Sequence, residues 1–155
     1  MKKVKIIGAL SLLAALLVSV VSLKANEKTP DFKPRPAVVR QFLEEVKKNE
    51  NWKTAFLTGT EEQIVFMNIS PQTNPYNEIG EEVHPFDQVI FIVEGNAKAI
   101  IDGDSSSVTE GDLIFIPKGT NHNVVNVNEK KPLKLVSFYS ENDIPKDAVY
   151  KRKAD

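Results

Sequence analysis

The sequence predicts an all-β protein, a barrel or sandwich of short strands preceded by one short amphipathic helix. After Trp52 the chain becomes a series of short runs rich in Ile, Val and Phe, separated by turn residues, which is typical of this class. Tight turns are expected at Gly95-Asn96, Gly103-Asp104 and Glu110-Gly111, where Gly, Asn and Asp tolerate positive backbone dihedrals. Upstream of these runs, a stretch that begins at Pro36 carries apolar residues at helical spacing.

The helix is expected to open at Pro36, and its apolar stripe comprises Val38 or Val39, Phe42, Leu43 and Val46. The stripe either covers a face or edge of the following sheet or binds a partner.

Strands are expected at 53–57, 63–69, 82–84, 88–93, 97–101, 106–108, 113–116, 121–126 and 133–139. The charged tail, 141–155, is expected to be loop or edge material. Side chains of Phe66, Ile90, Ile92, Phe115 and Val124 are expected to line or pack the barrel, and outward-facing Val89, Phe91 and Val93 predict a second sheet or a homodimer face.

The N-terminal residues have the composition of a secretory signal. Three lysines precede an apolar run from Ile6 to Leu23, and Ala25 supplies a small residue at a cleavage point. We therefore expect a signal peptide over 1–25, an extended linker with three prolines over 26–36, and a single domain over 37–155. The expected location is periplasmic or secreted. The alternative is an uncleaved N-terminal membrane anchor, since about 18 apolar residues is near the lower limit for a bilayer span.

Composition excludes several kinds of partner and site. Removal of residues 1–25 takes away four lysines and no acids, so 20 basic and 21 acidic side chains become 16 and 21, a net charge of −5. No basic stripe remains to follow a phosphate backbone, so nucleic acid is not an expected partner, nor is a membrane after cleavage. The absence of cysteine excludes disulfides, a cysteine nucleophile and thiolate metal ligands.

The two histidines of the chain carry the functional prediction. Residues two apart on a strand share a face, so Glu82 and His84 point the same way, and Gln88 keeps that parity. In a closed barrel the inward face is common to all strands, which allows His122 to meet them from a separate strand. Two imidazoles, a carboxylate and an amide oxygen suit one divalent ion of Fe, Mn, Ni or Zn. The alternative is that the two histidines do not share a site and that each has only a structural role.

These two segments resemble the paired motifs of the cupin superfamily. The second motif comprises Gly111, Pro117, Gly119, His122 and Asn126 at the family's spacing. In the first motif, Glu82 stands where most cupins have their first histidine, His84 where they have the second, Gln88 where they have a glutamate, and Gly95 closes the turn. The resemblance implies a cupin-type barrel, that is, a double-stranded β-helix or jelly roll.

A narrower resemblance is carried by Ile79 to Pro85, Asp87-Gln88 and Ile101 to Gly103. These residues are similar to those of small single-domain bacterial cupins that are often labelled as resembling mannose-6-phosphate isomerase. The expected function is therefore an exported metal-binding cupin acting on a small molecule by an oxygenase-type or isomerase-type reaction, with catalytic residues not identified. Two alternatives stay open: a non-catalytic binder of a small ligand or metal in the cell envelope, and a metal-free structural cupin.

Overall fold

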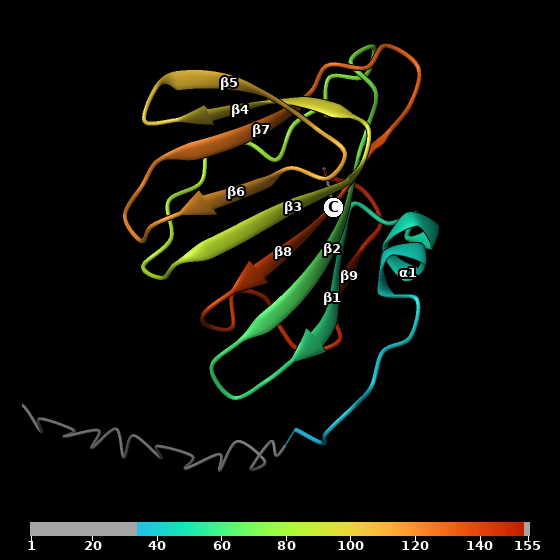
Figure 1. Cartoon of the computed structure of the whole chain (residues 1–155), viewed down its shortest axis with the longest axis vertical. Coiled ribbons are helices and arrows are strands. Elements are labelled where there is room, and N and C mark those ends of the chain that lie inside the picture. The colour runs from blue at the N-terminus through green and yellow to red at the C-terminus, as the bar shows by residue number, and fades with distance from the viewer. Residues whose placement is uncertain (1–33, 154–155) are drawn as a thin grey trace, which may run out of the picture. The chain divides into compact units, whose positions relative to one another are not determined.

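The structure, a computed structural model, describes residues 34–153, which form one short helix and two antiparallel β-sheets (Figure 1). The elements in chain order are α1 (Phe42–Lys48), β1 (Lys53–Thr58), β2 (Gln63–Ile69), β3 (Gln88–Glu94), β4 (Asn96–Ile101), β5 (Asp104–Thr109), β6 (Leu113–Ile116), β7 (His122–Asn126), β8 (Leu133–Tyr139) and β9 (Val149–Tyr150). The larger sheet has six strands in the order β6-β3-β8-β2-β1-β9, and the smaller has three in the order β5-β4-β7. The predicted all-β jelly-roll class is confirmed.

The apolar core lies between the two sheets. Alternating side chains of the larger sheet, such as Ile90 and Ile92 on β3, meet Ala97, Ala99 and Val124 from the smaller sheet. The prediction of an inward position is wrong for two aromatic residues. Phe66 belongs to the cluster beneath the helix, and Phe115 is exposed, because the neighbours Met67 and Ile116 take the inward positions of those strands.

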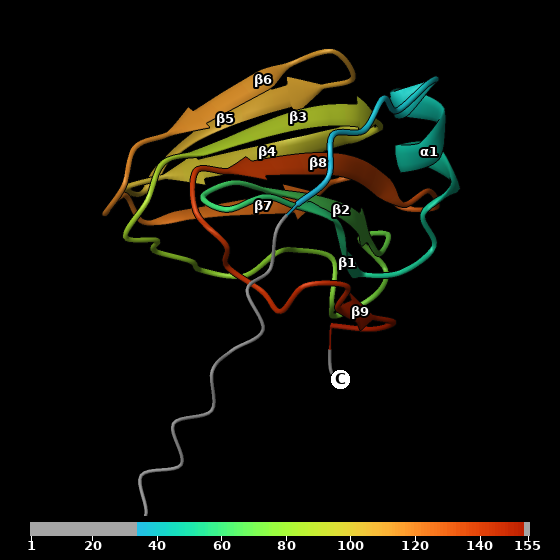
Figure 2. The same cartoon turned by 90° about the horizontal axis from the view of Figure 1, so that it is seen from below.

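Helix α1 covers part of the outer face of the larger sheet, next to β3 and β8 (Figure 2). Its side chains Phe42 and Val46 join Phe66 and Val136 in a second apolar cluster. The helix begins at Phe42 and not at Pro36 as predicted, because Gln41 has left-handed backbone dihedrals (φ 52°, ψ 43°), which interrupt a right-handed helix. Val38 upstream is consequently 84% exposed. The face-covering role of the apolar stripe is thus confirmed only for its C-terminal part.

The strand predicted at 82–84 is replaced by one isolated antiparallel bridge between Glu82 and His122. Pro85 cannot donate to a ladder, and Gly80 has a positive φ of 94°, so the segment cannot continue as a regular strand. The tail contributes β9, which pairs with β1 as edge material. Residues 34–36 of the expected linker lie outside helix and strand, and the expected signal peptide lies outside the described residues. Among the described residues, no helix has the length and apolarity that a membrane crossing requires.

Candidate metal centre

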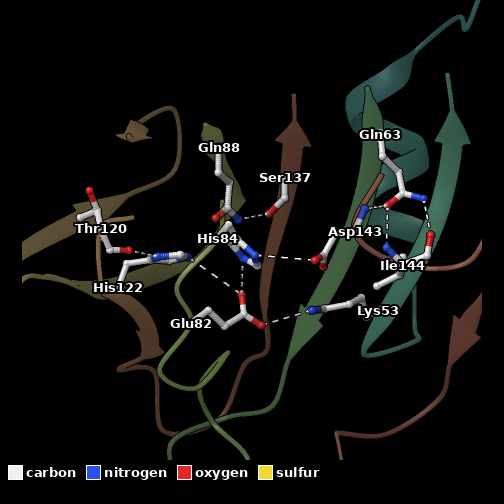
Figure 3. A network of polar contacts seen from close by, with 10 residues as sticks. All are labelled: Lys53, Gln63, Glu82, His84, Gln88, Thr120, His122, Ser137, Asp143 and Ile144. Atoms are coloured by element: carbon white, nitrogen blue, oxygen red, sulfur yellow. Dashed lines mark hydrogen bonds and ion pairs between the residues drawn. The ribbon is translucent and has the colours of Figure 1, made fainter. Parts of the chain in front are cut away.

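Glu82, His84 and His122 come together at one point of the structure (Figure 3). One ligand atom from each lies within 4.8 Å of the other two. The bridge between Glu82 and His122 brings the segments together, with N–H to carbonyl distances of 2.9 and 3.0 Å in the two directions. The side chains of Glu82 and His84 meet at 3.3 Å, so they lie on the same side as the sequence predicted, although residues 83–84 are not in a strand.

His122 presents a free ring nitrogen toward this point. Its ring is buried, and its Nδ1 lies 3.1 Å from the carbonyl oxygen of Thr120. A carbonyl oxygen only accepts hydrogen bonds, so Nδ1 carries the proton and Nε2 carries the lone pair. Nε2 lies 4.0 Å from Glu82 Oε2 and has no hydrogen-bond partner. A buried polar atom of this kind needs a partner, and a water molecule or a bound ion can supply it.

His84 is oriented in the same manner by an acidic residue. Its Nδ1 lies 3.6 Å from Asp143 Oδ1, and its Nε2 lies 3.3 Å from Glu82 Oε2. The ring stacks on Phe86 with a centroid distance of 4.8 Å and meets the ring of Tyr139 at 5.4 Å. In the metal-free protein the shorter contact is a hydrogen bond that Nε2 donates to Glu82 Oε2. A metal would replace that proton, and Asp143 lies where it would accept the proton of Nδ1.

Asp143 belongs to the loop after β8, and a buried glutamine fixes that loop. Gln63 Oε1 accepts hydrogen bonds from the backbone N–H groups of Asp143 at 3.2 Å and Ile144 at 3.1 Å. Gln63 Nε2 donates to the carbonyl of Ile144 at 2.8 Å and to Thr58 Oγ1 at 3.1 Å. Strand β2 thereby holds the loop against the metal centre (Figure 3).

The two carboxylate oxygens of Glu82 have different partners. Its Oε1 accepts from Lys53 Nζ at 3.3 Å, while its Oε2 faces the histidine nitrogens. Lys53 is buried on β1 and lies 5.0 Å from the centroid of the Trp52 ring. Burial raises the pKa of Glu82, but the hydrogen bond to His84 and the charge of Lys53 lower it by more, so the pKa lies below its usual value. The carboxylate is therefore ionised at neutral pH.

Gln88 and Tyr139 complete the buried surroundings. Gln88 Nε2 donates to Ser137 Oγ at 3.2 Å, and its Oε1 is buried without a partner. The hydroxyl of Tyr139 is also buried without a hydrogen-bond partner. Burial, together with the negative charges of Glu82 and Asp143, raises the pKa of Tyr139 above its usual value, so this hydroxyl keeps its proton.

The donor set fits a divalent transition metal. Two imidazole rings and one ionised carboxylate converge. His122 Nε2 has a lone pair for a cation, and a metal would replace the proton that His84 Nε2 donates to Glu82. Sequence reasoning missed Lys53, Tyr139 and Asp143. Lys53 and Tyr139 carried a signal, since both occupy inward positions of strands, where a charged or hydroxyl side chain is unusual. Asp143 lies in an irregular loop, where no periodicity applies.

Comparison with known proteins shows which family the chain resembles. Residues 72–139 match the cupin domain model. The uncharacterized protein YrkC of Bacillus subtilis is 33% identical over 134 residues, which cover 81% of this chain and 68% of YrkC. The uncharacterized protein L612 of Acanthamoeba polyphaga mimivirus is 35% identical over 106 residues, 66% of this chain and 64% of L612.

Solved structures agree with this assignment. The crystal structure of BH2720 from Bacillus halodurans is 34% identical, with a TM-score of 0.72 over 78% of this chain and 92% of BH2720. Protein NMB1881 from Neisseria meningitidis shares the fold at 20% identity, with a TM-score of 0.52 over 68% of this chain and the whole of NMB1881. Together with the jelly-roll sheets and the second histidine motif, these matches show that the chain belongs to the cupin family.

Proposed function

We propose that this cupin binds one divalent metal ion, Fe, Mn, Ni or Zn, through Glu82, His84 and His122, with Gln88 as the candidate fourth ligand. A single observation carries the proposal: three acceptor atoms lie within 4.8 Å of one another, and the buried Nε2 of His122 has no partner. The orphaned Oε1 of Gln88 supports its inclusion. A neutral amide oxygen is the weakest donor of the four, so Gln88 contributes least to affinity.

The function that this site supports best is metal-dependent chemistry on a small oxygenated molecule, of oxygenase or isomerase type. A divalent metal with open coordination positions supplies a Lewis acid when bound. The chain's own residues prepare the site. Thr120 holds the proton on Nδ1 of His122, Asp143 faces Nδ1 of His84, and Lys53 donates to one oxygen of Glu82. Tyr139, which is buried beside His84, keeps its hydroxyl proton and is a candidate hydrogen-bond donor in these surroundings. The narrower resemblance to cupins labelled as similar to mannose-6-phosphate isomerase agrees with a small-molecule ligand.

A non-catalytic binder of a small ligand or metal is the second candidate. One observation favours it: the titratable groups around the centre are engaged with one another. Glu82 contacts Lys53 and His84, and Asp143 contacts His84, so neither carboxylate is an uncommitted general base. In this role the site would capture its ligand without turnover.

Elemental analysis of protein purified without added metals tests metal binding. We expect about one transition-metal ion per chain, and a large loss of metal in His122→Ala with the fold retained, because the lost group is a ligand. Asn121→Ala, an exposed neighbour, serves as the matched control and should keep its metal. Equal metal contents in wild type and His122→Ala would remove His122 from the site.

Oxygen consumption and isomer formation on a panel of diols, phenols and sugars then distinguish the two candidates. Turnover that depends on the metal supports the enzyme. A full metal complement without oxygen uptake or isomer formation supports the binder.

We also propose that the protein is exported and that a signal over 1–25 is removed. The basic residues before an apolar run support this, and the composition after Ala25 favours cleavage over retention as an anchor. Mass spectrometry of the protein isolated from the cell envelope should find an N-terminus near Asn26. Finding the intact N-terminus in a membrane fraction would support the anchored alternative.

A further inference from the structure

The buried polar atoms without a partner fall into two groups. Five such side-chain atoms occur in residues 34–153. Those of Gln88, His122 and Tyr139 belong to the surroundings of the metal centre. The other two, Trp52 Nε1 and Asn68 Oδ1, belong to residues that line one pocket of about 540 Å³. None of the three metal-centre ligands lines this pocket.

The pocket is positively charged in a chain whose net charge is negative. The consecutive cations Lys151, Arg152 and Lys153 line it, against the single carboxylate of Glu50. Lys153 Nζ also lies 3.8 Å from Glu78 Oε1, which neutralises part of this charge. Three basic residues and one acidic residue line the pocket, and this composition favours a ligand that carries a phosphate or carboxylate group.

The remaining walls add aromatic rings and hydrogen-bonding groups. Trp52 and Tyr76 line the pocket, and Tyr76 is 45% exposed. Asn68 Nδ2 already donates to the carbonyl of Glu50 at 3.0 Å, so its Oδ1 is the atom that lacks a partner. The indole N–H needs an acceptor and the amide oxygen needs a donor, and a hydroxyl group supplies both. Aromatic walls favour a ligand with a flat apolar face.

We propose that this pocket binds a small anionic sugar. The sugar ring lies against the aromatic side chains, its hydroxyls reach Trp52 Nε1 and Asn68 Oδ1, and its charged group lies beside Lys151 and Arg152. Both orphaned atoms are buried, so the sugar's hydroxyls reach them only when side chains that line the pocket move aside, and each atom then gains a partner. Binding at this pocket does not require the metal, because the two sites share no residue.

The chain contains a single tryptophan, so Trp52 fluorescence reports on the pocket directly. Wild-type protein is titrated with glucuronate and with glucose 6-phosphate, in parallel with and without added zinc. We expect a saturable change for at least one anionic sugar, at similar affinity in both conditions, and at least tenfold weaker binding of neutral glucose. The two anionic probes separate carboxylate recognition from phosphate recognition. Inorganic phosphate should compete with the preferred sugar only weakly, since it lacks the ring.

A charge-neutralised pair of variants provides the control. Lys151→Gln combined with Arg152→Gln should weaken binding of the anionic sugar at least tenfold, whereas Lys130→Gln combined with Lys131→Gln, on another exposed turn, should leave it unchanged. Circular dichroism establishes that both are folded, and calorimetric titration measures binding if the fluorescence does not change. Absence of binding by calorimetry, equal affinity for glucose, or equal affinity of the Lys151/Arg152 variant would overturn the proposal. A negative result for sugar binding would not change the measured metal content, so the sugar pocket and the metal site are tested separately.

Discussion

At the scale of single residues, the candidate metal centre depends on the partners that hold each side chain from the side away from the common point. Each candidate ligand has one polar atom bound by an outer partner and one that faces the common point. The outer contacts are His122 with Thr120, His84 with Asp143, and Glu82 with Lys53. The partners of the two histidines orient the rings before a metal arrives, which raises metal affinity without adding a ligand.

Lys53 is expected to lower the affinity for a metal ion while it stabilises the metal-free protein. Its ammonium compensates the Glu82 carboxylate, but it also places a positive charge next to a site for a cation. In Lys53→Met we expect a lower melting temperature of the chelated protein, because a largely buried carboxylate loses its partner. We expect zinc affinity to rise roughly 10-fold, because the repulsion is gone.

The measurement is a zinc titration together with thermal unfolding of the chelated protein. Lys98→Met, an exposed lysine of β4, should change neither quantity. Weaker zinc binding by Lys53→Met, with the melting temperature unchanged, would show that Lys53 and the metal do not share the carboxylate.

Asp143 is a positioning residue for His84. The variant Asp143→Asn keeps the shape of the side chain and loses the charge that faces His84 Nδ1, where it would support the proton of a metal-bound ring. Loss of an outer partner of a metal-bound histidine costs about 10- to 100-fold in metal affinity. We expect zinc affinity to fall within that range with little change in the melting temperature of the chelated protein. Asp104→Asn, exposed on β5, is the control, and equal zinc affinities of the two variants would contradict the assignment.

At the scale of elements, the position of the Asp143 loop depends on strand β2. Gln63 makes four hydrogen bonds to the loop and to Thr58 from a fully buried position. Gln63→Leu leaves two backbone N–H groups and one carbonyl without partners, and we expect a loss of about 3 kcal/mol in the free energy of unfolding. Zinc affinity should fall as well, because the loop is released. Urea unfolding and zinc titration, with the exposed Gln72→Leu as control, measure both. A variant as stable as wild type would show that the loop does not depend on Gln63.

The end of α1 is joined to β8 by a buried lysine. Lys134 donates to the carbonyl of Asn49, and its neighbours Glu94 and Glu50 face it. Burial lowers the pKa of Lys134, and the two carboxylates only partly oppose this effect. The folded protein therefore binds fewer protons than the unfolded chain just below the ordinary lysine pKa, so this group adds stability as the pH rises through that range.

A comparison with Lys134→Met isolates this contribution. The stability of wild type relative to the variant should increase between pH 8 and pH 10, since the other titrating groups cancel in the difference. Urea unfolding at both pH values measures it. A difference that is constant or decreases with pH would contradict the shifted pKa.

At the scale of the whole molecule, a cation that binds only the folded state must stabilise the fold. The ligands come from two segments that the folded sheets bring together, so the site does not exist in the unfolded chain. At a metal concentration of 100 times Kd, we expect a stabilisation of about 2.7 kcal/mol. Thermal unfolding with zinc and with chelator measures this, and His122→Ala should show none of it. An identical melting temperature of wild type in both conditions would favour the metal-free structural alternative.

Much of the architecture could be predicted from the sequence because it rests on local patterns. Alternation of apolar residues and the turn glycines located most strands to within a few residues, and the bounds of β2, β6 and β8 were predicted fully. Local patterns failed where tertiary contacts compete with them. The left-handed Gln41 shortened the helix, and a bridge to His122 replaced the strand expected near Glu82.

The sequence by itself determined the all-β class and the two histidine segments, since these follow from a residue period of two and from turn chemistry. It also predicted that Glu82 and His84 share a side, although the strand on which that prediction relied did not form. Only the tertiary structure decided that His122 lies beside Glu82, that Lys53 takes one oxygen of that carboxylate, and that Asp143 reaches His84 from a loop. The physical reason is that side-chain electrostatics depend on distances across the core, and contacts between residues far apart in the chain leave no periodic trace in its sequence.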